Sequence, residues 1–243
     1  MLRFVAVIVL ACATDLEWSA WRDSAGRPRP AIGTLSTGSP ALLLLGLAAG
    51  PDPAAMDAIP AGSTVLHVGF CGGLRRGLNA GDVVVATAVS PRVLDVEAEN
   101  QLPDPVRLDQ DGVDALRASL AELPDRLGQG ALLTVSTFLH RAADKEAIGE
   151  AWTYVACDLE ASMLAAACRE RGLRYLGVRA VSDAADHTVK PAIRGAPGAA
   201  SRLLRWAARP TAAAEATRAI WGGRRARATL SRAIPQALAA LQD

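Results

Sequence analysis

The 243-residue sequence has little of what several protein classes need. Its formal net charge is +1, which excludes a generally basic nucleic-acid-binding protein. It has no apolar run of the ~20 residues that a membrane-spanning helix requires. Its four cysteines form no CxxC pair and its three histidines have no metal-ligand spacing, so neither a disulfide framework nor a metal site is expected. This use of cysteine suits a reducing cytoplasm.

Apolar sequence is abundant, and it is arranged in alternating strand and helix patterns. Hydrophobic residues make up 51% of the sequence and charged residues 21%, which is typical of a globular protein. Apolar runs rich in β-branched residues predict buried strands at residues 4–11, 64–70, 82–89, 131–138, 154–157 and 175–182. Helical patterns lie between them, so we expect an α/β fold in a single domain, with a mostly parallel mixed central sheet flanked by helices.

The first apolar run, MLRFVAVIVLAC, allows two interpretations. VLAC at residues 9–12 faintly resembles a lipoprotein cleavage site, which would make the run a signal peptide. The run is short and a single Arg precedes it, so a first buried strand is favoured. Thr14 or Asp15 then offers a cap for a helix with Trp18 and Trp21 on its apolar side.

Residues 65–85, VLHVGFCGGLRRGLNAGDVVV, place glycines directly after a strand. Such glycines let backbone N–H groups approach a ligand, often an anion. Tight turns are the more common reason for glycine at such a place, so this motif alone is weak evidence for a site.

Residues 156–172, ACDLEASMLAAACRERG, bring Asp158 and Glu160 to the junction of a short strand and a helix. Ligands of open α/β sheets bind at the carboxyl ends of strands, which favours a binding role for these acids. Acids are also favoured as helix caps, and capping alone would account for Asp158. For Glu160 the two interpretations are equally open.

Residues 177–186, GVRAVSDAAD, hold an arginine within an apolar strand. Arg179, Val181 and Asp183 share one face of this strand because side chains alternate. A buried arginine is costly unless it is paired and hydrogen-bonded, so its partner must be a carboxylate or an anion. A structural Arg–Asp ion pair is the alternative to a binding site.

The three motifs together resemble the nucleoside phosphorylase and nucleosidase superfamily, which includes uridine phosphorylase and methylthioadenosine/S-adenosylhomocysteine nucleosidase. The chain reads VGFCGGLRRGLNAGDVVV, CDLEAS and VRAVSDAAD where the family has VGxCGG…L..GDVVV, a (D/E)-M-E-A helix entry and (I/V)R-x-(I/V)-SD. The N-terminal ACATDLEWSAWRD is also similar to the family's first strand and helix, with Glu17 at its acidic position. The resemblance covers residues 4–190. It implies a three-layer phosphorylase-like fold and an enzyme that cleaves nucleosides.

The resemblance implies a role for each candidate residue around the substrate. An enzyme of this kind must protonate or hold the departing base, hold the sugar and deliver a nucleophile. Asp183 would act on the purine N7 as general acid, with Ser182 orienting it. Glu160 would accept hydrogen bonds from the ribose hydroxyls, and Leu159 would pack beneath the sugar. Phe138, in TVSTFLH, would lie against the base, with a core aromatic as the alternative.

The remaining acids and Arg179 complete this set. Arg179 would brace the acidic groups, and it joins Asp183 and Glu17 as an expected catalytic residue. Asp158 is placed with the substrate-binding residues. An Asp at position 183 resembles enzymes for 6-aminopurines, whereas an Asn there suits 6-oxopurines, so adenine is the expected leaving base.

The nucleophile is either water or phosphate. Family hydrolases position water with a carboxylate near the N-terminus, which Glu17 matches, whereas family phosphorylases bind phosphate through arginines. One arginine position holds His67, which could bind phosphate if protonated but is a poorer clamp than arginine. Phe70 replaces a small Ser or Thr where the family contacts the nucleophile, and Cys71 and Gly72 beside it are expected to contact substrate. Hydrolysis is therefore favoured, and phosphorolysis is the alternative.

Residues 194–243 are expected to form a basic helical extension of two helices, packed on the catalytic domain of residues 1–193. The extension holds nine Arg against one Glu and one Asp. Its apolar residues, which alternate with these arginines, are Leu203, Leu204, Trp206, Ile220, Trp221, Leu230 and Ile234. A basic amphipathic helix of this kind can lie on an anionic membrane surface. A solvated helix that closes the fold is the favoured alternative.

The extension, the D-x-E-(A/S)-S entry and Pro191 resemble the hopanoid-associated branch of the superfamily, whose proposed reaction removes adenine from adenosylhopane. The resemblance thus implies a nucleosidase for an adenine nucleoside, with a lipid nucleoside of that type as one candidate, and neither metal nor organic cofactor. We expect a cytoplasmic homodimer that binds a small nucleoside and no nucleic acid, with peripheral contact at the inner membrane face. A nucleoside-binding or membrane-associated protein that lacks catalysis is the alternative from another class.

Overall fold

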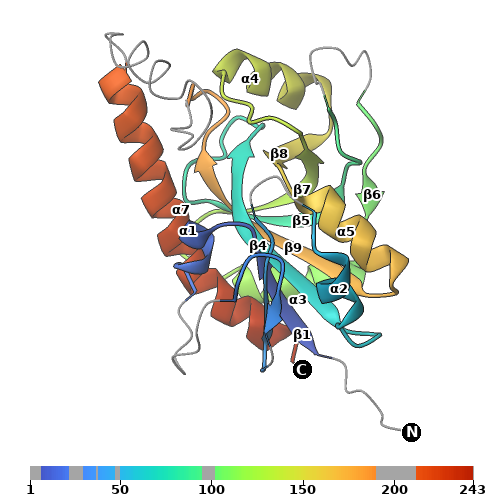
Figure 1. The fold of residues 1–243 in the computed structure, drawn as a ribbon. Helices are drawn as coiled ribbons and strands as arrows, with labels where there is room; N and C mark the ends of the chain where they lie inside the picture. Colours follow the sequence, from blue (N-terminus) through green and yellow to red (C-terminus); the bar gives the residue numbers. More distant parts are fainter. Residues whose placement is uncertain are drawn as a thin grey trace, which may run out of the picture.

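In the computed structural model, the strands of the described part of the chain join in one nine-stranded sheet (Figure 1). The structure describes residues 7–21, 30–36, 38–46, 50–94, 102–189 and 212–242. Within these ranges the strands are β1 (Ile8–Cys12), β2 (Leu35–Ser36), β3 (Ala41–Leu44), β4 (Thr64–Gly73), β5 (Val83–Val89), β6 (Val106–Arg107), β7 (Leu127–Thr134), β8 (Tyr154–Asp158) and β9 (Arg174–Asp183). The N-terminal apolar run therefore contributes a core strand, β1, which lies between β3 and β4.

The pairing of the strands closes part of the sheet on itself. The order is β2-β3-β1-β4-β8-β7-β5-β6, and β9 pairs with both β4 and β5. β4, β8, β7, β5 and β9 thereby form a ring of pairs. Five of the nine pairings are parallel and four are antiparallel, so the sheet is mixed with a small parallel majority.

Helices cover the sheet on both sides, as expected for the α/β class. In the described part of the chain they are α1 (Asp15–Trp18), α2 (Pro53–Asp57), α3 (Gln110–Leu120), α4 (Ala142–Ala151), α5 (Ala161–Glu170) and α7 (Ala212–Ala240). α2 and α5 belong to one core cluster, which includes Met56 and Leu164. α3 and α7 belong to another, which includes Leu116 and Leu230. Figure 1 shows α7 along one side of the molecule and α2 and α5 on the opposite side.

Two strand ends differ from the sequence prediction, and both affect the site. The strand predicted to end at Phe70 continues through Gly73, because β8 pairs with Gly72 and Gly73 and β9 pairs with Gly72. The strand predicted over residues 131–138 ends at Thr134, so Phe138 lies in the following loop.

The C-terminal helix α7 is part of the core. Leu230 and Ile234 are fully buried against the sheet and α3, as the favoured interpretation, a helix that closes the fold, requires. Ile220 and Trp221 are exposed, as contact with a membrane surface would require. No helix in the described ranges combines the length and apolarity that are needed to cross a bilayer.

Other predictions about the extension fall on residues 190–211, outside the described ranges. They concern the domain boundary after residue 193, a second helix, and the residues Pro191, Leu203, Leu204 and Trp206.

Candidate active site

The ends of β4, β8 and β9 meet at Gly72. Gly72 lies opposite Cys157 of β8 and Asp183 of β9. A Cβ at this position would lie 3.2 Å from Cys157 Sγ and 3.4 Å from Asp183 Oδ2, so a side chain would push these groups aside. Glycine here allows close packing of backbone against the Asp183 carboxylate. The glycine-rich motif therefore builds the surroundings of Asp183.

The carboxylate of Asp183 is buried and held at both oxygens. Ser182 Oγ donates to Oδ1 at 2.7 Å, and it lies 3.1 Å from the carbonyl oxygen of Cys71. Lys145 Nζ donates to Oδ2 at 2.7 Å and to the carbonyl oxygen of Ala184 at 2.7 Å. The orienting contact expected of Ser182 is thus present, and Lys145 adds a second contact that was not predicted.

A signal for Lys145 was present in the pattern of α4. Lys145, Ile148 and Gly149 form the buried side of this helix, at i, i+3 and i+4 spacing. A fully buried lysine is rare and needs a partner. A lysine on the apolar side of a helix could therefore have been matched to one of the predicted buried acids.

Arg179 forms a buried ion pair with Asp158. Its Nη2 and Nε donate to Asp158 Oδ2 at 2.8 and 3.1 Å. Asp158 Oδ1 accepts from Thr134 Oγ1 at 3.0 Å and from the N–H of Ala161 at 3.3 Å. Burial opposes the charge of Arg179, but Asp158 and then Tyr175 raise its pKa above the ordinary value. The structural ion pair that the sequence left as an alternative is therefore present, and Asp158 is engaged within the protein at both oxygens.

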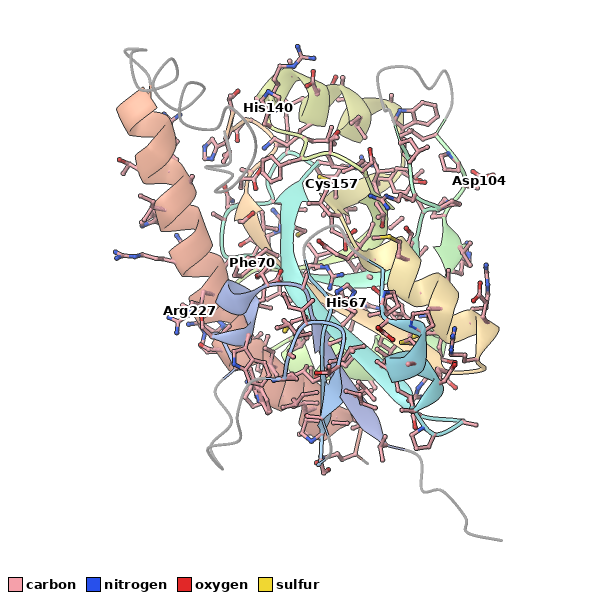
Figure 2. All side chains as sticks on the ribbon, in the orientation of Figure 1. His67, Phe70, Asp104, His140, Cys157 and Arg227 are labelled. Atoms are coloured by element: carbon pink, nitrogen blue, oxygen red, sulfur yellow. The ribbon has the colours of Figure 1, made fainter. Side chains whose placement is uncertain are left out.

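His67 lies in the interior of the molecule and contacts this ion pair (Figure 2). Its Nδ1 is 2.8 Å from Arg179 Nη2 and 3.0 Å from Tyr175 Oη. An arginine can only donate, so Nδ1 is the acceptor and the ring is neutral. Burial, and then Arg179, hold the pKa of His67 well below its ordinary value. These contacts disfavour the protonated form that phosphate binding by His67 would need.

Glu17 has a structural role as well as a position near the glycine-rich strand. Its Oε2 accepts from the N–H groups of Ala13 and Thr14, and Thr14 Oγ1 accepts from the N–H of Glu17, which together make a capping box. Its Oε1 accepts from the N–H of Phe70 at 2.7 Å. A carboxylate offers about four acceptor sites, so these three bonds leave capacity for a water.

The environment of Glu17 makes its carboxylate more basic than that of an exposed glutamate. Burial raises the pKa of this carboxyl, against the hydrogen bond from Phe70 and the charge of Arg179, which lower it. A Cβ on Gly69 would lie 2.6 Å from Glu17 Oε1, so glycine at that position makes room for the carboxylate.

Glu160 is the N-cap residue of α5, but its side chain makes no capping hydrogen bond. The hydrogen bond that the capping interpretation of Glu160 requires is therefore not formed. The residue is nevertheless buried. Leu159 is partly buried beside the core cluster that includes Cys157. Both residues lie in the turn between β8 and α5, as the motif predicted.

The two phenylalanines of the predicted site differ in their packing. Phe70 is partly buried against the core cluster of α3 and α7. Phe138 is half-buried and lies outside the clusters formed by the described core residues. Phe138 therefore does not pack as a core aromatic, which was the alternative to its contact with the base.

A separate cavity of about 660 Å³ lies between β5, β6 and α5. Its lining includes Ser90, Leu108, Met163, Arg169 and Tyr175, and it contains none of Asp183, Glu160 and Glu17. The candidate site therefore lies at the strand ends and not in this cavity.

Buried acids at the converging strand ends of an α/β sheet lie where proteins of this class bind their ligands. Residues 21–217 match the sequence profile described as the phosphorylase superfamily. The chain belongs to this superfamily.

Individual relatives add detail. A 5'-methylthioadenosine/S-adenosylhomocysteine nucleosidase of Exiguobacterium sp. is 30% identical over 133 residues, which cover 50% of this chain and 56% of the relative. The matched segment thus spans about half the length of such curated relatives.

Solved structures share the fold over almost the whole chain. The nucleosidase of the same description from Neisseria meningitidis, in complex with methylthio-immucillin-A, has a TM-score of 0.68 at 20% identity and covers 96% of this chain and 98% of its own. The futalosine hydrolase of Helicobacter pylori has a TM-score of 0.66 at 14% identity and covers 97% of this chain and 98% of its own.

Proposed function

We propose that the chain hydrolyses the N-glycosidic bond of an adenine nucleoside and releases free adenine. The observation that carries this proposal is the buried Asp183, whose carboxylate is fixed by Ser182 and Lys145 at the end of β9. Once it carries a proton, a carboxyl group at this place can pass it to N7 of the departing purine. The similarity to nucleosidases supports the same reaction class.

The other site residues take the roles that the resemblance implied. Glu160 binds the ribose hydroxyls, Leu159 packs beneath the sugar and Phe138 lies against the base. Asp158, His67 and Arg179 act behind them as a buried support, because their polar atoms contact one another.

Water is the proposed nucleophile, and Glu17 is the residue that positions it. As the C1′–N9 bond breaks, its electron pair stays with the base, and Asp183 gives its proton to N7. The water oxygen bonds to C1′ and its proton passes to Glu17, so adenine and the free sugar are the products. Phosphorolysis would need a cationic anion-binding group, and His67 is neutral and bonded to Arg179.

A panel of adenine nucleosides, assayed with and without added phosphate, tests this function. We expect free adenine and an unphosphorylated sugar in phosphate-free buffer. Adenine release that requires phosphate and yields ribose 1-phosphate would establish phosphorolysis instead. Tight binding without release of adenine would favour the non-catalytic alternative.

A lipid nucleoside of the adenosylhopane type remains a second candidate substrate, supported by the exposed surface of α7. Ile220 and Trp221 are 61% and 55% exposed, and Arg225 lies over the Trp221 ring at 5.0 Å. Arg218 and Arg224 are exposed on the same helix. Exposed apolar side chains among arginines are typical of helices that contact anionic lipid.

Cosedimentation with vesicles of anionic phospholipid at low salt tests this contact. We expect the protein to pellet, and the Ile220→Ser/Trp221→Ser variant to stay in the supernatant with its fold intact. Absence of the wild-type protein from the pellet would contradict peripheral membrane contact. The proposal also includes a cytoplasmic homodimer, and light scattering on the purified protein tests its oligomeric state separately.

A further inference from the structure

We propose that Lys145 is a positioning residue for Asp183, which fixes the carboxylate and compensates its charge as the proton leaves for the base. The proposal rests on the proposed nucleosidase function. Lys145 is fully buried, and its ammonium group lies 2.7 Å from Asp183 Oδ2. Burial of a lysine without a counter-charge is unfavourable, so Lys145 needs the Asp183 carboxylate as its partner at this place.

The position of α4 fixes where the ammonium group of Lys145 lies. A Cβ on Gly149 would lie 1.7 Å from the carbonyl oxygen of Leu74, so glycine lets α4 press against the end of β4. At the other end of the helix, the N–H of Ala142 donates to Thr188 Oγ1. α4 is therefore held both to the glycine-rich strand and to the segment that follows Asp183.

Lys145 is the charged side chain that contacts the Asp183 carboxylate among the described residues. Cys157 of β8 and Cys71 of β4 are close enough for the charge of Asp183 to affect their thiols. Burial, and then Asp183, raise the pKa of Cys157 to about 12, and burial raises that of Cys71 well above its ordinary value. Both thiols are therefore neutral over the working range, and Ser182 on β9 contributes a neutral hydroxyl.

This arrangement assists the proposed step through charge. Transfer of a proton from Asp183 to N7 leaves a carboxylate in a buried site. An opposite charge within ~4–6 Å favours that charged form, and Lys145 meets this condition before the reaction begins. A preorganised group of this kind stabilises charge where it develops and needs no rearrangement.

Lys145→Met tests the proposal by removing the charge and keeping the length of the side chain. We expect kcat for adenine release to fall by about 10-fold to 100-fold with little change in KM, below the ~10²–10⁴-fold that a general acid contributes. We also expect the pH profile of kcat to move to higher pH, since the carboxyl keeps its proton longer without a neighbouring cation. The matched control is Glu150→Gln, a charge change on the exposed side of α4, which should leave kcat and the profile unchanged.

A titration of the protein labelled with ¹³C at the aspartate carboxyl carbons provides a readout that does not depend on activity. Asp183→Asn identifies the Asp183 signal, and we expect this signal to titrate at higher pH in Lys145→Met than in the wild-type protein. If Lys145→Met does not fold, Lys145→Gln, which keeps a donor for the Ala184 carbonyl, serves in the same comparison. Identical titrations and identical pH profiles would overturn the proposal. A wild-type protein that releases no adenine would overturn the proposed function, and the titration would still decide whether Lys145 controls the proton on Asp183.

Discussion

Asp158 is the last residue of β8 and Asp183 is the last residue of β9, and each is paired with a buried cation. The two pairs differ in their surroundings. Arg179 also contacts His67, and Asp158 also accepts from Thr134, so the first pair is enclosed by other polar groups of the protein. Asp183 bonds only to Ser182 and Lys145 among the described side chains. We therefore assign the first pair to support and the second to chemistry.

Arg179→Met is expected to lower the free energy of unfolding by about 3–5 kcal/mol, because it leaves Asp158 buried without its counter-charge. Urea unfolding near neutral pH measures this loss. Arg117→Met is the matched control, since Arg117 forms an exposed pair with Asp114 that contributes about 0–1 kcal/mol. Equal losses in the two variants would contradict a supporting role for the buried pair.

His67 is expected to make the fold sensitive to acid. Its pKa in the folded state lies well below the ordinary 6.5, so the unfolded chain binds the proton more readily. Stability that is complete above the unfolded pKa is therefore lost as the pH falls toward the folded pKa, by at most ~1.4 kcal/mol per pH unit for one group.

His67→Gln keeps an acceptor for Arg179 but cannot titrate in this range. Unfolding free energies of both proteins between about pH 5 and 8 should therefore show a steeper decline for the wild type below its unfolded pKa. Parallel profiles would show that His67 gains its proton as easily in the folded state as in the unfolded chain.

Sequence reasoning found the charged residues of the site but not all of their partners. The strand end at Asp183 and the orienting Ser182 were readable because adjacent residues carry the motif. Lys145 was missed because its contact with Asp183 depends on how α4 packs, and no local pattern contains both residues. Similarly, TDLE at residues 14–17 has the spacing of a capping box, and this structural role of Glu17 was not recognised.

At the scale of elements, α7 is tied to the catalytic strand through one glycine. A Cβ on Gly222 would lie 2.0 Å from the carbonyl oxygen of Ser182, whereas the neighbouring Gly223 has open space. Further along the helix, Thr229 Oγ1 donates to the carbonyl oxygen of Gly81. Figure 2 shows Arg227 on the same helix near α1, where it donates to Ser19. α7 therefore supports the end of β9.

The two adjacent glycines give a matched pair of variants. Gly222→Ala should lower both thermal stability and adenine release, because its methyl group would displace α7 from the Ser182 carbonyl. Gly223→Ala should raise stability by up to about 1 kcal/mol, since alanine is the better helix former. Thermal unfolding and activity of both variants measure this, and equal behaviour would contradict the docking of α7 on β9.

Most strands and helices could be predicted from the sequence, but the pairing that closes part of the sheet into a ring could not. Apolar runs identified β1, β4, β5, β8 and β9, because buried strands read as continuous hydrophobic segments. The antiparallel pairing of β9 with β5 depends on partners far apart in the sequence, which no local pattern specifies. For the same reason the end of β4 was placed before the glycines instead of after them.

At the scale of the whole molecule, the extension was understood only in part. An alternation of apolar residues with arginine is compatible with a surface helix and with a helix that closes a core. Leu230 and Ile234 show that the second half of α7 closes the core, while Ile220 and Trp221 leave its first half exposed. Composition could not separate these halves, because the distinction comes from which side of the helix meets α3 and the sheet.

The central claim is that Asp183 protonates the base that leaves. The most direct measurement is adenine release by Asp183→Asn in phosphate-free buffer, with the fold verified by circular dichroism. We predict that turnover falls by at least ~100-fold, the usual contribution of a general acid. Asp186→Asn is the matched control, because the Asp186 side chain is 68% exposed three residues further along, and it should keep wild-type turnover. Near-normal turnover in Asp183→Asn would contradict the account.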